Sequence, residues 1–275
     1  MQVISVDCGR SGVKAVSAHE RVYFPATLGT WRQLRNGREM GVEDLVIDFA
    51  GERYFGGRVA IEEAEDGAQM MTAYKAHLDT KILTLAALHR LVTDDEPVML
   101  VTGLPLAFHN DHDKQRMREL LLGTHTIGVH GVTKTIHIER VEVAAEGATA
   151  AWSIAQRRPG RFHVLDVGSR TVNYATAVDG RWRDRESDSL DYGFETFRGT
   201  EEQFARVVIS DLSTRLRPLG LIVLVGGRGS LLPHLRQYHA NVELHPDALF
   251  ANAVAFRELG VIAHARQHTQ AETRQ

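Results

Sequence analysis

The chain has 275 residues, and its 32 Lys and Arg nearly balance its 35 Asp and Glu, which gives a formal net charge of −3. This balance argues against broad electrostatic binding to nucleic acid or to an anionic membrane. With 43% hydrophobic and 24% charged residues, the composition is that of a globular chain and excludes extensive disorder. The length favours one large domain or two modest ones.

The cysteine content and the N-terminus exclude further classes of protein. Cys8 is the only cysteine, so neither an intrachain disulfide nor a cysteine-based zinc cluster is possible. The first residues carry no basic segment of a signal peptide, and no run approaches the roughly 18 apolar residues of a membrane span. We therefore expect a soluble, cytoplasmic protein that does not use a membrane.

Short apolar runs alternate with stretches of helical periodicity along the chain. The runs predict buried strands at residues 3–6, 98–101, 162–165 and 221–225. Apolar residues recur at Leu78, Ile82, Leu85 and Val92, and again at Phe204, Val208, Leu212 and Leu216, with a period near 3.6 that predicts helices over 77–92 and 201–216. The second helix starts with Thr200 and Gln203, which fit a capping box. The alternation predicts an α/β fold.

One pattern occurs twice in the sequence. Residues 3–16 predict a strand, an Asp-x-Gly turn and a second strand, and residues 162–175 repeat this layout. We expect two related halves that face one cleft, separated near residues 157–160. The predicted organisation is a first domain over 1–156 with a small insertion at about 28–75, a second domain over 157–263, and a polar, frayed tail over 264–275.

The two turns suggest a clamp for phosphate and magnesium. Gly9, Gly12 and Gly168 allow backbone N–H groups to converge on phosphate oxygens. Asp7 and Asp166 precede these turns, and a carboxylate there can hold Mg²⁺ through water. The alternative is that Asp-x-Gly only closes a tight hairpin.

A glycine-rich segment forms a third element of the series. Residues 224–232 predict a strand that passes through Gly226, Gly227 and Gly229 into a helix. Such a passage brings backbone close to a ligand and offers it a helix N-terminus. Alone, this motif is a weak signal.

In this order, the motifs resemble those of the actin/Hsp70/sugar-kinase superfamily, in which small-residue helices such as 144–151 and 251–255 connect the halves. The pair Asp7 and Lys14 and the segments 54–60 and 102–106 are most similar to bacterial actin-like plasmid-segregation proteins of the ParM/AlfA/StbA type. The resemblance implies a duplicated ribonuclease-H-like fold around a nucleotide cleft. Full-sized members of the superfamily insert a whole subdomain between the strand region that ends near 192–193 and the glycine-rich segment. Here only 27 residues, 194–220, intervene, so we expect the outer subdomain of the second half to be missing.

The resemblance also implies a set of site residues. Bound ATP or GTP would contact Gly9, Arg10, Ser11, Gly12, Lys14, Gly168, Ser169, Arg170, Thr171, Gly226, Gly227, Arg228 and Gly229. Asp7 and Asp166 would hold Mg²⁺ through water, and Glu146, at the start of the first connecting helix, would orient the water that attacks the γ-phosphate. The alternative for Glu146 is a solvated glutamate in a first helical turn.

The sequence departs from the family pattern at a few positions. Arg10, Ser169 and Arg170 stand where small residues are usual, and Asn173 stands where an Asp is common. The two arginines either reach phosphate or point to solvent. If they fill the phosphate cup, hydrolysis is slow and nucleotide affinity is altered.

The resemblance implies a filament-forming Mg-dependent ATPase or GTPase. Such filaments would position plasmid DNA through a DNA-binding adaptor protein, with no direct contact to nucleic acid. Two other functions stay open at this point: a small-molecule kinase similar to type III pantothenate kinase, and a non-catalytic actin-like scaffold.

Overall fold

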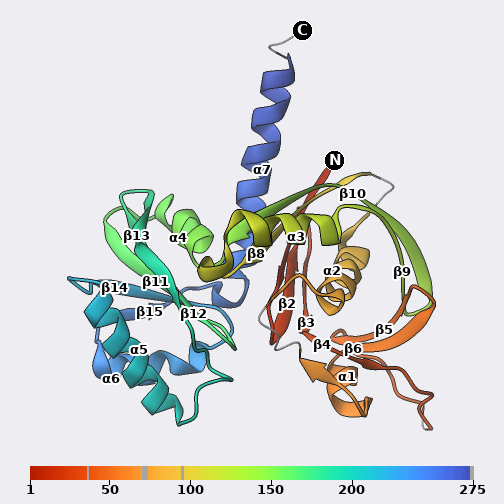
Figure 1. Ribbon diagram of the computed structural model, residues 1–275, viewed down its shortest axis with the longest axis horizontal. Coiled ribbons are helices and arrows are strands. Elements are labelled where there is room, and N and C mark those ends of the chain that lie inside the picture. Colours follow the sequence, from red (N-terminus) through yellow and green to blue (C-terminus); the bar gives the residue numbers. More distant parts are fainter. Residues whose placement is uncertain (36, 70–73, 94–95, 273–275) are drawn as a thin grey trace. The chain divides into compact units, whose positions relative to one another are not determined.

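The computed structural model describes residues 1–35, 37–69, 74–93 and 96–272, with Gln69 and residues 267–272 described by their backbone only (Figure 1). Contacts group the chain into two compact units. Unit 1 comprises residues 1–103, 111–143 and 256–275, and unit 2 comprises 104–110 and 144–255. Residues 144–156 thus group with unit 2 and residues 256–275 with unit 1, whereas the sequence predicts boundaries at 156 and 263. Position 36, positions 70–73 of the predicted insertion and positions 273–275 of the predicted tail lie outside the described residues.

Unit 1 is built on one mixed sheet in which the described strands follow the order β3-β2-β1-β8-β10-β9-β5-β6-β4-β7. In chain order the strands are β1 (Gln2–Cys8), β2 (Gly12–Val16), β3 (Arg21–Pro25), β4 (Thr27–Thr30), β5 (Asp44–Phe49), β6 (Glu52–Gly57), β7 (Ala68–Gln69), β8 (Val98–Leu104), β9 (Gly123–Val129) and β10 (Val132–Ala145), the last of which reaches unit 2. β1 pairs antiparallel with β2 and parallel with β8. The strands predicted at 3–6 and 98–101 are therefore confirmed as neighbouring parallel strands of this sheet.

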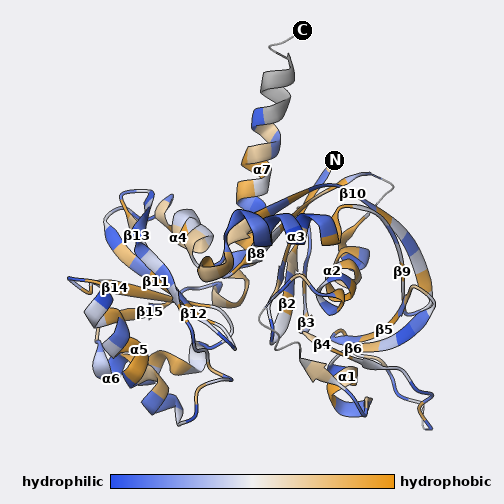
Figure 2. Ribbon diagram, viewed as in Figure 1, coloured by the Kyte–Doolittle hydropathy of each residue, from blue (hydrophilic) through white to orange (hydrophobic). Residues whose placement is uncertain are grey.

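Helix α2 (Leu78–Leu91) provides the core of unit 1. It contacts β1, β2 and β3 as well as β9, so its apolar residues, orange in Figure 2, are buried on several sides. This explains one difference from the predicted stripe: ten residues of the helix are buried, whereas Leu78 at its first position is 49% exposed. Helix α3 (Asp111–Leu121) is largely hydrophilic and buries only Met117 and Leu121.

The predicted insertion contains its own small core. Helix α1 (Arg58–Glu63) packs against β4, β5 and β6, and Phe55, Val59 and Ala60 are fully buried there. Trp31 packs against this cluster, with its ring centroid 6.4 Å from that of Phe55. The short pairing of β5 with β9 joins the insertion to the main sheet.

Unit 2 has a five-stranded sheet in the order β13-β12-β11-β14-β15. Its strands are β11 (Arg161–Val167), β12 (Val172–Val178), β13 (Arg181–Leu190), β14 (Leu221–Val225) and β15 (Val242–Leu244). Leu165 and Val167 belong to a core cluster with helices α5 (Glu201–Arg215) and α6 (Leu232–Tyr238), whereas Phe162 and Val164 pack with α4 (Ala148–Ala155). Since successive strand residues point to opposite faces, Asp166 lies on the α4 face. The capping box of Thr200 and Gln203 at the start of α5 is confirmed.

The internal duplication is visible in the strand registers. The order β3-β2-β1-β8 in unit 1 corresponds to β13-β12-β11-β14 in unit 2, with the same parallel and antiparallel pairings. Asp7 lies opposite Lys14, and Asp166 lies opposite Asn173. The α/β fold with two related halves follows from this repeat. Between Phe194 and Gly220 the described chain holds one helix, α5, which leaves no room for a further subdomain.

Two predicted helix starts differ from the structure, and so does the predicted tail. Residues 144 and 145 end β10, and α4 starts only at Ala148 after a turn at Glu146 and Gly147. The glycine-rich segment leads first into a 3₁₀ turn, Gly229–Leu231, and α6 follows with Pro233 in its first turn. Helix α7 (Ala251–Glu272) continues past residue 264, because the tail is rich in residues with high helix propensity such as Ala, Arg, Gln and Glu.

One described helix, Ala248–Arg266, is long and apolar enough to cross a membrane by length and composition alone. Of the 18-residue stretch of this segment that meets the criterion, 33% is buried within the structure. Core helices of soluble proteins meet the same criterion. The segment Ala248–Arg266 contains Arg257, Glu258 and Arg266.

Candidate functional site

The first Asp-x-Gly turn joins β1 to β2. Gly9 N donates to Gly12 O at 3.1 Å and closes the turn. A Cβ on Gly9 would lie 3.0 Å from Gly12 O and 3.1 Å from the Lys14 ammonium, so glycine allows the lysine to lie directly against the turn. Lys14 Nζ is 3.6 Å from Asp7 Oδ2, and Asp7 is buried. The predicted residues Asp7, Gly9, Gly12 and Lys14 therefore lie together, with Arg10 and Ser11 at the tip of the same turn.

Lys75 is a second cation at this turn, and the sequence reasoning missed it. Its ammonium lies 4.0 Å from Asp7 Oδ1, and its side chain is only 5% exposed. Two lysines thus approach the two oxygens of one buried carboxylate. The only sequence signal is a lone lysine three residues before α2, which no motif distinguishes.

The second turn joins β11 to β12 and repeats the first. Gly168 N donates to Thr171 O at 3.0 Å, as Gly9 N does to Gly12 O. The carbonyls of Gly168 and Ser169 accept from the N–H groups of Phe194 and Glu195, at 2.9 and 2.8 Å. This backbone support fixes the turn that carries Arg170.

Asp166 is the centre of a buried polar cluster in unit 2. Its Oδ2 accepts from Asn252 Nδ2 at 2.9 Å and from Asn173 Nδ2 at 3.4 Å. Asn173 Oδ1 accepts in turn from the Ser189 hydroxyl at 2.6 Å. Asp166, Asn173 and Asn252 are at most 6% exposed, so their hydrogen bonds are shielded from water. Asn173 departs from the family pattern at the sequence level, whereas no motif in the sequence distinguishes Asn252.

The glycine-rich segment meets the same carboxylate. Gly226 has a φ of 88°, which only glycine adopts readily, and a Cβ there would lie 2.8 Å from Asp166 Oδ1. Gly227 and Gly229 follow in the turn after β14. Arg228 pairs with Glu195 and stacks on Phe194, with Cζ 4.1 Å from the ring centroid, so its guanidinium is engaged within the protein.

Glu146 lies in the turn before α4 and not in its first helical turn. It is 7% exposed, which contradicts the alternative of a solvated helical glutamate. Its N–H donates to Leu104 O at 2.9 Å, and its carbonyl accepts from Ala148 N at 2.8 Å. The next residue, Gly147, has a φ of 72° and lies so close to Asn173 that a Cβ would be 3.1 Å from the Asn173 Cβ.

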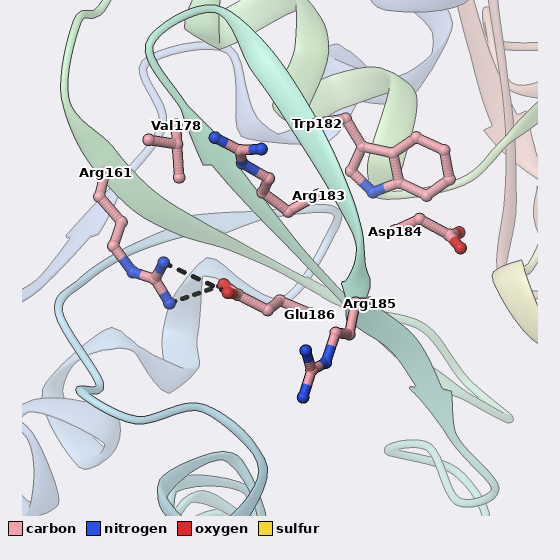
Figure 3. A pocket seen from close by; sticks show the side chains of 7 residues that line it. All are labelled: Arg161, Val178, Trp182, Arg183, Asp184, Arg185 and Glu186. Carbon is pink, nitrogen blue, oxygen red and sulfur yellow. Dashed lines mark hydrogen bonds and ion pairs between the residues drawn. The ribbon is translucent and has the colours of Figure 1, made fainter.

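Two hollows lie apart from these clusters. One, of about 490 Å³, is lined by Arg161, Val178 and residues 182–186 in unit 2. Figure 3 shows Arg161 and Glu186 of this hollow facing each other, joined by an ion pair of 2.6 Å. The other, of about 440 Å³, lies in unit 1 near the start of β1 and is lined in part by Gln2 and Arg257. Neither hollow contains a predicted site residue.

Each unit supplies one buried carboxylate of a kind that can hold a hydrated magnesium ion. Among the residues that the structure describes, no three His, Cys, Asp or Glu side chains come together to hold a metal. Mg²⁺ usually keeps several waters and takes one or two carboxylates together with phosphate oxygens. Asp7 in unit 1 and Asp166 in unit 2 are carboxylates of this kind, each beside a glycine turn.

A model of the family "Actin like proteins N terminal domain" matches residues 5–148, which is more than half of the chain. The chain belongs to the actin-like protein family. The matched region starts in β1 and includes the first turn, the inserted subdomain and Glu146. No curated protein sequence matches the chain significantly.

Solved structures support the actin-like fold over almost the whole chain. A 15-stranded ParM filament from Clostridium botulinum has a TM-score of 0.79 at 19% identity and covers 94% of this chain and 98% of that one. An AlfA filament bound to AMPPNP has a TM-score of 0.71 at 17% identity, with 98% of each chain covered. An archaeal actin homologue in complex with ADP has a TM-score of 0.73 at 20% identity, covering 94% and 98%.

In this actin-like protein, the arginines that depart from the family pattern are not fully exposed. Arg10 and Arg170 are both half-buried beside the turns. Ser169 is 6% exposed, so it contributes to the inside of the second turn.

Cys8 adjoins the first turn and offers a test of its burial. The thiol is 3% exposed, and burial is the main cause that raises its pKa to about 11. At pH 8 only about 0.1% of the thiol is then ionised, and thiolate is the reactive form. We expect labelling by Ellman's reagent at pH 8 to be very slow in the native protein and rapid in urea. Native labelling as fast as in urea would contradict this burial; because Cys8 is the only cysteine, the readout is unambiguous.

Proposed function

We propose that the protein is a nucleotide-dependent filament former, which binds ATP or GTP with Mg²⁺, polymerises, and hydrolyses the nucleotide slowly. The observation that carries this proposal is the repeated arrangement of a buried aspartate beside a glycine-closed turn, Asp7 in one unit and Asp166 in the other. The relatives that adopt this fold include filaments and complexes with AMPPNP and ADP. Their likeness supports the proposal for this chain.

Each cluster has a role in this proposal. The turns at 9–12 and 168–171 bind phosphate oxygens through backbone N–H groups, and Lys14 adds a positive charge in the first turn. Bound Mg²⁺ would neutralise charge on the phosphates, with Asp7 and Asp166 holding its water ligands. Glu146 orients the attacking water, and residues 226–229 approach the adenosine.

We further propose that the filaments act in the cytoplasm in plasmid DNA segregation and reach DNA through an adaptor protein. The net charge of −3 does not favour direct binding of DNA, which depends on Lys and Arg contacts to phosphate. The resemblance to ParM and AlfA supports this assignment.

Light scattering and negative-stain electron microscopy test the proposal. At tens of micromolar protein, Mg·ATP or Mg·GTP is expected to raise scattering and produce filaments, whereas protein without nucleotide stays unassembled. Asp7→Ala is expected to abolish the response, and Asp48→Ala, which removes an exposed ion pair with Arg53 on the inserted subdomain, serves as the control.

Three outcomes would contradict the proposal. The first is a lack of assembly with either nucleotide. The second is ATP turnover that depends on a small metabolite and forms no polymer, which would indicate a kinase. The third is assembly without detectable nucleotide binding in calorimetry, which would indicate a scaffold.

A further inference from the structure

Asn252 uses both ends of its side-chain amide. It is the second residue of α7 and is 6% exposed. Its Nδ2 donates to Asp166 Oδ2 at 2.9 Å, and its Oδ1 accepts from Gly147 N at 3.0 Å. One side chain therefore joins the end of β11, the turn before α4 and the start of α7, although its two partners lie 86 and 105 residues away in sequence.

The chemistry of this bridge requires an amide. A carboxylate at position 252 could accept from Gly147 but could not donate to Asp166, and an apolar side chain could do neither. Because the bridge is buried, the loss of either bond leaves a polar group without compensation from water.

The bridge fixes two groups that the proposed function assigns to hydrolysis. One donor at 2.9 Å and a second, from Asn173, at 3.4 Å hold the same oxygen of Asp166, which directs the other oxygen toward Gly226. The bond to Gly147 N holds the residue that follows Glu146. Asn252 thereby sets the separation between the Asp166 carboxylate and the Glu146 turn.

We propose that Asn252 is a positioning residue for nucleotide hydrolysis, which holds Asp166 and the Glu146–Gly147 turn in one arrangement. This inference rests on the proposed function. We expect Asn252 to affect the rate of hydrolysis much more than nucleotide affinity, because it acts through Asp166 and the Glu146–Gly147 turn.

Single-turnover hydrolysis of Mg·ATP and equilibrium binding of Mg·ATP provide the first test. Asn252→Ala is expected to slow hydrolysis by about 10- to 100-fold, the usual effect of removing a group that orients a metal-holding carboxylate, while affinity changes by less than about threefold. Tyr192→Phe is the control, because it removes a partly buried hydrogen bond of unit 2, from the Tyr192 hydroxyl to Asp211 at 2.7 Å, in which none of these groups takes part. A merely structural role predicts parallel losses of rate, affinity and melting temperature in Asn252→Ala.

Asn252→Asp separates the two halves of the bridge and is close in size to the native residue. It keeps an acceptor for Gly147 but, as a carboxylate, cannot donate to Asp166. We expect Asn252→Asp to hydrolyse ATP at pH 8 about as slowly as Asn252→Ala, although its bond to Gly147 is retained. Hydrolysis at the wild-type rate in Asn252→Asp would overturn the proposal.

Amide hydrogen exchange at Gly147 gives a readout that does not need activity. Exchange is expected to be at least about tenfold faster in Asn252→Ala than in the wild type and unchanged in Asn252→Asp. If the wild type binds and hydrolyses ATP but both Asn252 variants do so normally, only this inference fails. If the wild type hydrolyses no nucleotide, the proposed function fails, and unchanged Gly147 exchange in Asn252→Ala then overturns the bridge as well.

Discussion

Glu146→Ala is expected to slow nucleotide hydrolysis by about 100-fold or more while leaving nucleotide-dependent assembly intact. The reason is the environment of this side chain. It is 7% exposed, and backbone hydrogen bonds to Leu104 and Ala148 fix the turn that carries it. A group held in this way can orient water without reorganising during the reaction.

Glu146→Gln distinguishes orientation from proton transfer. Glutamine keeps the length and one acceptor oxygen, so a residue that only orients water should retain activity within about tenfold of the wild type. A residue that must also accept a proton should lose as much activity as in Glu146→Ala. Phosphate release in single-turnover assays measures both variants.

Glu142→Ala is the control for these variants. Glu142 is a partly exposed glutamate of β10 that pairs with Arg140 at 2.5 Å, and its loss should not alter hydrolysis. Normal hydrolysis in Glu146→Ala, with an unchanged melting temperature, would contradict the assignment of Glu146.

The free energy of unfolding is expected to fall as the pH drops from about 6.5 to about 4, with His163 as a major cause. His163 is 1% exposed, and burial, assisted by the nearby Arg161 charge, lowers its pKa from the ordinary 6.5 to about 4. Its Nδ1 lies 2.8 Å from the Thr176 hydroxyl, which itself donates to Glu186 O at 2.9 Å.

The sign follows from the two protonation states. Below about pH 6.5 the unfolded chain binds a proton at His163, whereas the folded protein stays neutral there until about pH 4, so acidification favours the unfolded state. One pKa unit corresponds to about 1.4 kcal/mol, so below about pH 4 the free energy of unfolding is lower by about 3 kcal/mol than at neutral pH. Above pH 7, His163 is neutral in both the folded and the unfolded state, so it no longer lowers the free energy of unfolding.

Urea unfolding at a series of pH values between 4 and 8 measures this effect. His163→Gln cannot titrate, so its stability should depend much less on pH across the same range. His19→Gln removes an exposed histidine and should keep the pH dependence of the wild type. Equal slopes for His163→Gln and the wild type would show that other groups cause the acid sensitivity.

The local parts of the site were predictable from sequence. Asp7, Gly9 and Lys14 lie within one hairpin, and the antiparallel register alone brings Asp7 opposite Lys14. The same is true of Asp166, Gly168 and Asn173. A hairpin motif specifies such neighbours because few residues separate them and the turn closes through its own backbone.

The positions of the helix starts were less predictable. Residues 144–151 consist mostly of alanine, the residue with the highest helix propensity, yet 144 and 145 end β10. Glu146 is consequently buried in a turn instead of exposed on a first helical turn. The start of α6 is also later than the glycine pattern predicts, because tertiary packing overrides local propensity.

The sequence by itself determined the two related halves, the aspartate-bearing turns and the membership of the actin-like family that these motifs indicate, because all of these are encoded in short, local patterns. Only the tertiary structure decided that Lys75 lies against Asp7 and that Asn252 joins Asp166 to Gly147. These contacts link residues 68 to 105 positions apart. They depend on how strands and helices pack, and no local spacing in the chain records that packing.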